Sequence, residues 1–315
     1  MTVQDLGRHG HQHVGLCPGG AMDPIAASLA NALVGNEPGE AALELTVLGP
    51  DLELERDTLV ALCGAEFEAN LPLNRPVLLE AGTRLSIGRA PRGARAYFAV
   101  AGGIAVAPVL GSRSTYLPGG FGGLGGRTLR RGDLLPLQKD SQELSRERFA
   151  RLKRKSGNTV RWSAPPQTVP EHEPVVLHVL DGQHFPSFDV ASQRAFSDSV
   201  WKIGPESNRM GFRFEGPKLA RGEDDEILSG PTCLGTVQVP SNGTPIALMA
   251  DHQTTGGYPK IAEIAGADIP RLAQLAPGAS VRFARCTLED AWALRHALRR
   301  RLHRTLRALA WEFGK

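Results

Sequence analysis

The chain has 315 residues, of which 41% are hydrophobic and 22% charged, enough to build real cores in one long domain or two ordinary ones. Its net charge of +3 is small, so nucleic-acid binding has little support. No apolar run approaches the roughly 18 residues of a membrane helix, and the N-terminus lacks a signal pattern, so we expect a cytoplasmic protein without membrane contact. The four cysteines lie far apart and lack zinc spacing, which argues against a metal site.

Glycine and proline are abundant, at 36 and 23 residues, whereas aromatic residues are few. This composition favours many short strands joined by tight turns over a helical bundle. Residues 24–34 predict a short helix, because Asp23 can cap its start and Gly35 follows its end. The strand predicted at 42–48 carries Glu44 among apolar neighbours. This carboxylate is either the buried partner of an arginine or a site residue, and we favour the first.

Further strands are expected in the first half at 59–62, 77–79, 84–87 and 96–100, with a closing strand at 132–137. Their spacing of about ten residues predicts a closed or nearly closed antiparallel β structure. The glycine-dense stretch 118–127 matches neither the phosphate loop GxxxxGK[ST] nor a dinucleotide fingerprint. It is either a mobile loop near a site or a linker-like turn.

The best domain boundary lies in the polar, proline-rich residues 139–174. The strand pattern then resumes at 175–180, 200–203, 212–214, 227–228 and 236–240. Residues 288–313 form the one long helical pattern, with an apolar face suited to docking and an arginine-rich face suited to solvent. The expected domains are 1–140, a linker at 141–174, a second domain at 175–287 and a C-terminal basic helix at 288–315.

The densest concentration of chemistry follows the strand predicted at 245–250. That strand ends in Asp251, His252, Gln253, Thr254, Thr255, Gly256 and Gly257, with Tyr258 and Lys260 just beyond. A strand mouth holds side chains rigidly, and glycines let backbone N–H groups approach a ligand. Asp251 and His252 can share a proton, and Lys260 can supply positive charge. The alternative is a turn whose polar side chains cap their own backbone.

Ordered motifs run along the chain from its first residues to about residue 285. They are TVQDLGR at 2–8, GAMD at 20–23, AVAGGI at 99–104, GSRSTY at 111–116, GGRTLRRGD at 125–133, NRMGFR at 208–213, QVPSNGTPI at 238–246 and MADHQTTGGYPKI at 249–261. Together they resemble the biotin-dependent carboxyltransferase family. That family includes the C component of prokaryotic 5-oxoprolinase, allophanate hydrolase subunit 2, the matching part of urea carboxylase, and a regulator that antagonises a kinase inhibitor.

The resemblance implies a mainly β fold with two cyclophilin-like β-barrel domains in tandem, followed here by the C-terminal helix. It also implies a hetero-oligomer with a related β-fold subunit, which is either the B component of 5-oxoprolinase or a protein like allophanate hydrolase subunit 1. In the oxoprolinase version, a third subunit, the A component, completes a complex that opens the lactam of 5-oxoproline to L-glutamate with ATP and Mg. The chain is then inactive without its partners.

Two alternatives stay open. One is a carboxyltransferase subunit acting on urea or allophanate-type amides, with carboxybiotin supplied by another protein, because the chain has no Met-Lys-Met biotin attachment motif. The other is a non-catalytic regulator that binds a kinase-inhibitor partner. No residue pattern distinguishes a lactam from urea.

On the oxoprolinase hypothesis, Asp251 or His252 acts as the base for water, and Lys260, Arg209 and Arg213 supply positive charge over a phosphate and an oxyanion. The substrate-binding set is Asn208, Arg209, Arg213, Gln253, Thr254, Thr255, Gly256, Gly257 and Tyr258. The charged residues also have a purely structural interpretation, in which Arg113 with Glu44 and Arg209 with Asp251 are buried ion pairs.

Overall fold

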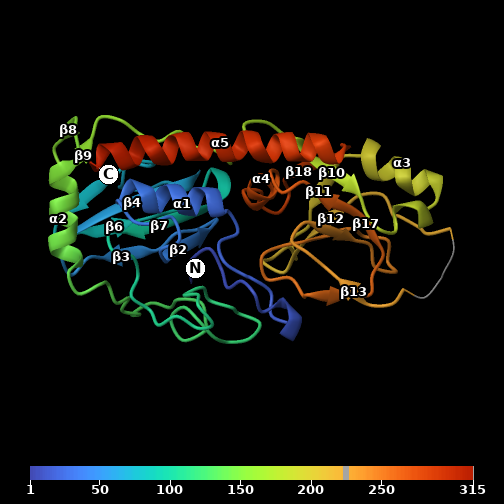
Figure 1. The fold of residues 1–315 in the computed structure, drawn as a ribbon, viewed down its shortest axis with the longest axis horizontal. Helices are drawn as coiled ribbons and strands as arrows, with labels where there is room; N and C mark the ends of the chain where they lie inside the picture. The colour runs from blue at the N-terminus through green and yellow to red at the C-terminus, as the bar shows by residue number, and fades with distance from the viewer. Residues whose placement is uncertain (223–226, 315) are drawn as a thin grey trace. The chain divides into compact units, whose positions relative to one another are not determined.

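The computed structural model describes residues 1–222 and 227–314, and the chain folds as two compact units. Unit 1 consists of Met1–Arg8, Gly19–Val169 and Arg300–Lys315. Unit 2 consists of His9–Pro18 and Pro170–Arg299. Both units are built mainly from β-strands, which confirms the predicted fold class (Figure 1).

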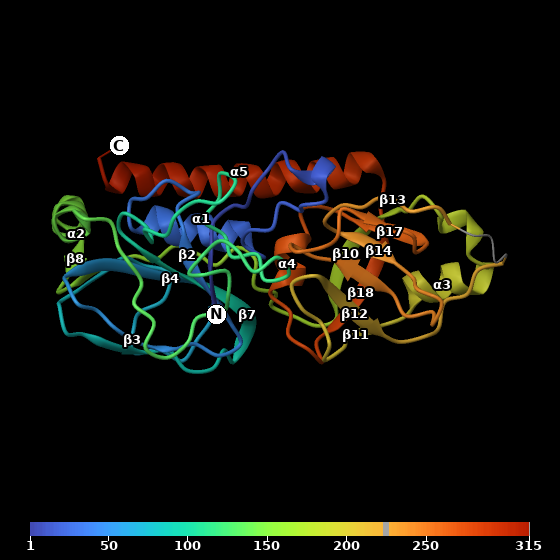
Figure 2. The same ribbon diagram turned by 90° about the horizontal axis from the view of Figure 1, so that it is seen from below.

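Unit 1 is organised around a seven-stranded antiparallel sheet with the order β1-β2-β7-β4-β5-β9-β8. Strands β2, β4, β7 and β8 of this sheet are labelled in Figure 2. The strands are β1 (Thr2–Gln4), β2 (Ala42–Thr46), β4 (Thr58–Glu66), β5 (Val77–Leu79), β7 (Arg92–Val100), β8 (Lys155–Ser156) and β9 (Thr159–Val160); β3 (Asp51–Glu53) and β6 (Arg84–Ser86) form a separate ribbon. Pairings among the described residues do not close this sheet into a ring. The strand predicted at 132–137 contributes only an isolated bridge, between Ile104 and Leu137.

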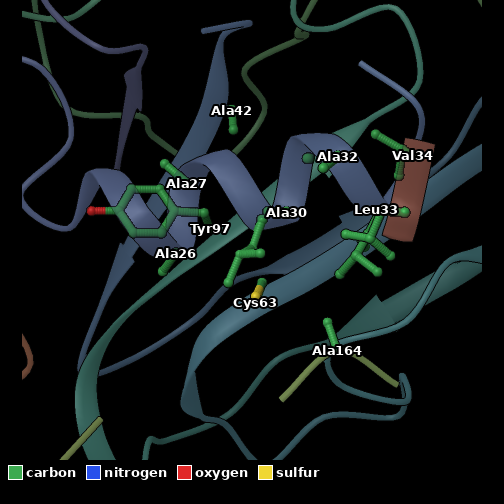
Figure 3. Close-up of a cluster of buried hydrophobic side chains, with 14 of the residues drawn as sticks. Ala26, Ala27, Ala30, Ala32, Leu33, Val34, Ala42, Cys63, Tyr97 and Ala164 are labelled. Carbon is green, nitrogen blue, oxygen red and sulfur yellow. The ribbon is translucent and has the colours of Figure 1, made fainter. Parts of the chain in front are cut away.

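Helix α1 (Pro24–Leu33) lies against the sheet of unit 1 and forms the centre of an apolar cluster. As predicted, Asp23 caps it, because Oδ1 accepts the N–H groups of Ile25 at 3.1 Å and Ala26 at 3.0 Å. Gly35 follows its end at a φ of 72°. Figure 3 shows the helix above Cys63 of β4 and beside Tyr97 of β7, which are both buried. Every residue of the helix from Ala26 to Leu33 is buried, which suits small alanine side chains.

The segment predicted as a linker at 141–174 is largely part of unit 1. It forms α2 (Ser141–Arg151), β8 and β9, and β9 pairs with β5 through Thr159 and Val77. Its polar composition comes from an exposed helix, in which only Ser141 and Ser145 are buried. Polar residues on a solvated helix and polar residues in a linker look alike in a sequence, which explains the mistaken assignment.

Unit 2 is a closed barrel with the order β10-β17-β14-β15-β12-β11-β18, as predicted for the second half. Its strands are β10 (Val175–Asp181), β11 (Trp201–Ile203), β12 (Gly211–Glu215), β14 (Thr236–Gln238), β15 (Ile246–Leu248), β17 (Lys260–Ile264) and β18 (Ser280–Arg285). Among the strand pairs of the described residues, only β10–β18 is parallel, and it closes the ring. Aromatic rings fill the interior, where Phe283 stacks on Phe196 at 4.5 Å between ring centroids.

Short elements decorate the barrel. They are η1 (Gln12–Val14), η2 (Phe185–Ser187), α3 (Val190–Asp198), α4 (Ile269–Ala273) and a two-stranded ribbon of β13 (Gly230–Pro231) with β16 (Thr255–Gly256). The strand predicted at 227–228 is not formed, and the chain first pairs at Gly230. Strand β16 of this ribbon lies within the polar stretch singled out in the sequence.

The long helix predicted at 288–313 is present as α5 (Leu288–Glu312), which contributes residues to both units. Leu309 and Phe313 are buried in the core of unit 1, and Leu302 packs against it. At the other end of the helix, Leu288 and Trp292 are both 55% exposed. The predicted apolar face is therefore buried only in its C-terminal part.

Candidate functional site

One buried ion pair ties the end of β15 to the turn before β12. Only 2% of the Asp251 side chain is exposed. Arg209 donates from Nε to Oδ2 at 2.8 Å and from Nη2 to Oδ1 at 3.0 Å. The N–H of Asp251 also donates to the carbonyl of Arg209 at 2.8 Å. Both carboxylate oxygens are thus bound by a guanidinium, which is the structural ion pair that the sequence left open as an alternative.

His252, the next residue, is buried and held by backbone carbonyls. Its N–H donates to Met249 at 3.0 Å, and its Nδ1 lies 2.6 Å from the carbonyl oxygen of Gln253. A carbonyl oxygen only accepts, so Nδ1 carries the proton and Nε2 keeps a lone pair. Burial lowers the pKa of His252, although the Gln253 carbonyl and the charge of Asp251 oppose it, so the neutral ring is favoured. The proton-sharing pair predicted for Asp251 and His252 is not formed, because each side chain is engaged elsewhere.

Lys260 and Gln238 form a second cluster, and they face each other across β14 and β17 as direct cross-strand partners. The Lys260 ammonium is buried, with 6% exposure, and donates to the carbonyl of Pro231 at 2.5 Å. The Gln238 amide is buried too, and its Oε1 accepts from Nε2 of Gln253 at 3.2 Å. Gln238 was not among the predicted site residues, although it opens the motif QVPSNGTPI at 238–246.

The β13–β16 ribbon lies next to this cluster, and its strand β16 consists of two predicted substrate-binding residues, Thr255 and Gly256. Gly256 pairs directly with Gly230, and Thr255 with Pro231. The N–H of Thr232 donates to the carbonyl of Thr254 at 2.9 Å, which extends the ribbon by one step. A Cβ on Gly256 would lie 2.6 Å from Nε2 of Gln238, and a Cβ on Gly257 would lie 3.1 Å from Oγ of Ser229. The backbone at these two glycines therefore lies close to the Gln238 and Ser229 side chains.

Two ionisable residues that the sequence did not predict flank Lys260. Glu263 accepts at Oε2 from Oγ1 of Thr236 at 2.8 Å and from Sγ of Cys233 at 3.3 Å. Burial raises the pKa of Glu263, against the lowering effect of these two hydrogen bonds and of the Lys260 charge. His184 accepts the Lys260 N–H at Nδ1, at 3.1 Å, and burial with the charge of Lys260 lowers the pKa of its ring. The sequence signal that could have identified Glu263 is its position as a carboxylate among the apolar residues of the strand at 260–264.

The remaining predicted site residues lie at the surface. Oδ1 of Asn208 accepts the N–H of Met210 at 2.8 Å, so this side chain stabilises its own turn. Arg213 pairs with Glu206 at 3.4 Å in an exposed ion pair. Tyr258 is 51% exposed. The structure thus gathers Gln253, Gly256 and Lys260, places Arg209, Asp251 and His252 at the adjoining strand end, and leaves Asn208, Arg213 and Tyr258 outside this group.

In unit 1, two of the sequence motifs are joined by Asp5. Its carboxylate accepts from the N–H of Gly7 at 2.8 Å, from Oγ of Ser112 at 2.6 Å, and from Oγ of Ser114 and the N–H of Arg113. These donors belong to TVQDLGR and GSRSTY, so the two motifs occur together because one buried carboxylate binds both.

The ion pair predicted between Arg113 and Glu44 is not the one observed. Arg113 pairs instead with Glu40, at 3.7 Å. Glu44 accepts from the N–H of Met22 at 2.9 Å and from the hydroxyl of Tyr97 at 2.7 Å. The backbone can bring a buried donor to a carboxylate just as an arginine can, and the sequence does not show which.

The glycine-dense stretch 118–127 packs closely within unit 1 and is not a linker-like turn. A Cβ on Gly122 would lie 2.1 Å from the carbonyl oxygen of Ser114, and a Cβ on Gly126 would lie 1.9 Å from that of Gly120. Both glycines have positive φ, at 73° and 70°. The stretch belongs to a different unit from the predicted site residues.

Unit 1 also contains a cavity of about 800 Å³ between the β3 side of the sheet and residues 132–137. Its lining includes Leu43, Phe98, Val100 and Ile104, together with Asp51 and Glu53. None of the predicted site residues lines it. Within residues 1–222 and 227–314, no three His, Cys, Asp or Glu side chains form a group that could hold a metal ion, and no helix is long and apolar enough to span a membrane.

Comparison with known proteins gives the family. A family model described as carboxyltransferase domain, subdomain A and B, matches residues 14–285. The chain belongs to this carboxyltransferase family. Members similar to it include the C component of 5-oxoprolinase from Escherichia coli K12, which is 43% identical over 98% of this chain and 94% of that protein. The same component from Haemophilus influenzae is 35% identical over 93% of this chain and 91% of that protein.

A solved carboxyltransferase relative has the same fold. The urea carboxylase of Kluyveromyces lactis superimposes with a TM-score of 0.85 and 29% identity over 96% of this chain, which corresponds to 28% of that protein. The resemblance stated from the sequence motifs is therefore confirmed at the level of family and fold.

Proposed function

We propose that this chain is the C component of an ATP-dependent 5-oxoprolinase, and that it acts with partner subunits to open 5-oxoproline to L-glutamate. The observation that carries the proposal is alignment at 43% identity with the C component of a 5-oxoprolinase over nearly the whole length of both chains. The urea carboxylase relative contains a matching region that is only 28% of its length. The chain therefore matches nearly all of an oxoprolinase component but only part of a urea carboxylase.

The chemistry explains why a cationic, donor-rich site is needed. A lactam is an unactivated amide, so water attacks it slowly at neutral pH. Transfer of the γ-phosphoryl group of ATP to the lactam oxygen releases ADP and makes the ring carbon electrophilic. Water then adds to that carbon, and the C–N bond breaks with protonation of the nitrogen, which leaves an acyl phosphate. A second water hydrolyses the acyl phosphate and releases phosphate. Preorganised cations and N–H donors stabilise the negative charge that builds up in these steps.

The observed contacts support fewer residues in the roles that the sequence suggested. Arg209 is paired with Asp251, and Arg213 is paired at the surface, so Lys260 is the cation of this set with a carbonyl but no carboxylate partner among the described residues, and it is assigned to binding an anionic group of a substrate and not to a particular chemical step. His252 in its neutral form, with Nδ1 protonated, has the acceptor nitrogen that a base for water requires. Asp251 then acts by fixing the strand end and not as the base.

A magnesium ion that accompanies ATP does not fit these residues. The cluster around Lys260 presents an ammonium and amide N–H groups, whereas Mg²⁺ requires several oxygen ligands. We therefore assign no metal ligand to this chain, and we place the metal with ATP and the partner subunits. The partners on this proposal are a related β-fold subunit and a third subunit, as in the family resemblance.

The test is release of ADP by the chain co-purified with the subunits encoded beside its gene, with and without 5-oxoproline. Turnover that requires the lactam is the expected result, and a complex carrying Lys260→Met is expected to lose most of it. A well-formed complex that releases no ADP with 5-oxoproline would overturn the proposal. Carboxyl transfer to urea by the same complex, with a carboxybiotin donor, would then identify it as a carboxyltransferase subunit.

A further inference from the structure

The cross-strand pair of Gln238 and Lys260 has hydrogen-bonding capacity that the protein does not use. Gln238 is 1% exposed, and its Nε2 has no hydrogen-bond partner among residues 1–222 and 227–314. Lys260 is 6% exposed and spends one of its three N–H groups on the Pro231 carbonyl. Buried donors are nearly always paired, so two amide and two ammonium N–H groups left over at one place require a partner.

The two donors lie against the same two-stranded ribbon. Gln238 and Lys260 are partners in the antiparallel β14–β17 ladder, next to a register shift between Val237 and Gln238, and the ribbon of β13 and β16 shows where their side chains lie. Gly230 and Gly256 are direct partners in the β13–β16 ribbon in the same way. A Cβ on Gly256 would meet Nε2 of Gln238 at 2.6 Å, and a Cβ on Gly230 would meet Nζ of Lys260 at 3.5 Å. Gly256 thus lies against the Gln238 amide, and Gly230 lies near the Lys260 ammonium.

The charge around the donors is suited to an anion. Glu263 interacts electrostatically with Lys260, but its Oε2 is hydrogen-bonded to Thr236 and Cys233 and forms no ion pair with the ammonium. His184 uses Nδ1 to accept the backbone N–H of Lys260, so this nitrogen is not available to accept from the ammonium. A buried ammonium without a carboxylate within ion-pair distance is costly, and an anionic ligand removes that cost.

We propose that Gln238 and Lys260 form the subsite that holds the carboxylate of 5-oxoproline, with Gly230 and Gly256 lying next to them. This inference rests on the function proposed above. A carboxylate has two oxygens with about four acceptor sites, which match the four unused N–H groups. Urea and other simple amides have no such group, so the subsite selects a lactam that carries a carboxylate. A phosphate of ATP has the same oxyanion chemistry, and the experiment separates the two sources.

The experiment compares the wild-type complex with a complex containing Gln238→Glu, which keeps the size of the side chain but replaces an amide donor by a carboxylate. Gln193→Glu is the matched control, because the Gln193 amide donates to the Phe185 and Phe188 carbonyls in the same unit, away from the Lys260 ammonium. The variant is expected to raise KM for 5-oxoproline about tenfold to a hundredfold, with a much smaller change in kcat and in KM for ATP. The control is expected to leave KM for 5-oxoproline unchanged.

Binding measured by calorimetry keeps the test independent of turnover. The wild-type complex is expected to bind 5-oxoproline much more tightly than 2-pyrrolidinone, the same lactam without a carboxylate, and Gln238→Glu is expected to abolish this preference. Equal affinity for the two lactams, or no effect of Gln238→Glu, would overturn the subsite. A rise in KM for ATP alone would assign the donors to a phosphate and overturn it as well.

A second variant, Gln238→Met, is the control for misfolding, because it removes the donor without adding charge. It is expected to weaken 5-oxoproline binding in the same direction, and a folded Gln238→Met complex with wild-type affinity would also overturn the subsite. Failure of the proposed function looks different, because the wild-type complex itself would then release no ADP with 5-oxoproline.

Discussion

Asp251 illustrates how a residue with the look of a catalytic acid can be structural. Replacing it with alanine leaves the partly buried Arg209 guanidinium without its bidentate partner, so Asp251→Ala is expected to lower the free energy of unfolding by about 3–5 kcal/mol. The measurement is urea denaturation followed by circular dichroism. Glu206→Ala is the matched control, because it breaks the exposed pair with Arg213 and should change stability by less than about 1 kcal/mol. Equal losses in the two variants would show that Arg209 does not depend on Asp251.

Glu263 gives the protein a predictable response to pH. Burial raises its pKa above the ordinary value of 4.5, so the folded state holds this proton more tightly than the unfolded state does. The resulting stabilisation is fully present below about pH 4.5 and is lost as the pH rises through the higher folded pKa. Stability measured against pH should therefore fall more steeply in the wild type than in Glu263→Gln over this interval. A Glu263→Gln curve that runs parallel to the wild type would contradict the raised pKa.

At the scale of elements, the glycine-dense stretch of unit 1 offers a matched pair of substitutions. Gly125 and Gly126 have nearly the same φ, at 68° and 70°, so alanine at either position carries the same backbone strain of about 1–2 kcal/mol. A Cβ on Gly125 meets nothing within 4 Å, whereas a Cβ on Gly126 would lie 1.9 Å from the carbonyl oxygen of Gly120. Gly126→Ala is therefore expected to destabilise by about 1–3 kcal/mol more than Gly125→Ala. Thermal unfolding of the two variants checks this, and equal melting temperatures would refute the close packing.

Elements with strong local signals can be predicted from the sequence, and those that depend on partners far along the chain cannot. The sequence predicts helix α1 within one residue because Asp23 and Gly35 mark its ends chemically. The polar segment 141–160 resembles a linker instead, because its strand β9 is recognisable only through its pairing with β5. Sequence reasoning also picks out the stretch 251–260, but not that Gln238 faces Lys260, since β-register is set by the whole barrel.

At the scale of the whole molecule, α5 supplies apolar side chains to the core of unit 1 from the far end of the chain. Leu309 is 4% exposed, so Leu309→Ala is expected to lower the stability of unit 1 by about 2–5 kcal/mol. The neighbouring Arg307 is exposed, and Arg307→Ala should change stability by no more than about 0.5 kcal/mol. Denaturant unfolding of the two variants tests the contribution, and similar midpoints would show that the C-terminal turns add little.

The same division of the chain fixes an order of events during translation. Unit 2 is complete in sequence at Arg299, whereas unit 1 combines residues that precede unit 2 with residues that follow it from Arg300 onward. A ribosome therefore delivers every strand of the barrel in unit 2 before it delivers the helical turns that cover the older sheet. Until those turns are made, the nascent sheet of unit 1 keeps apolar surface open to water, the condition in which growing chains aggregate or bind chaperones. A chain cut after Arg299 would therefore keep unit 2 intact and leave unit 1 unfinished.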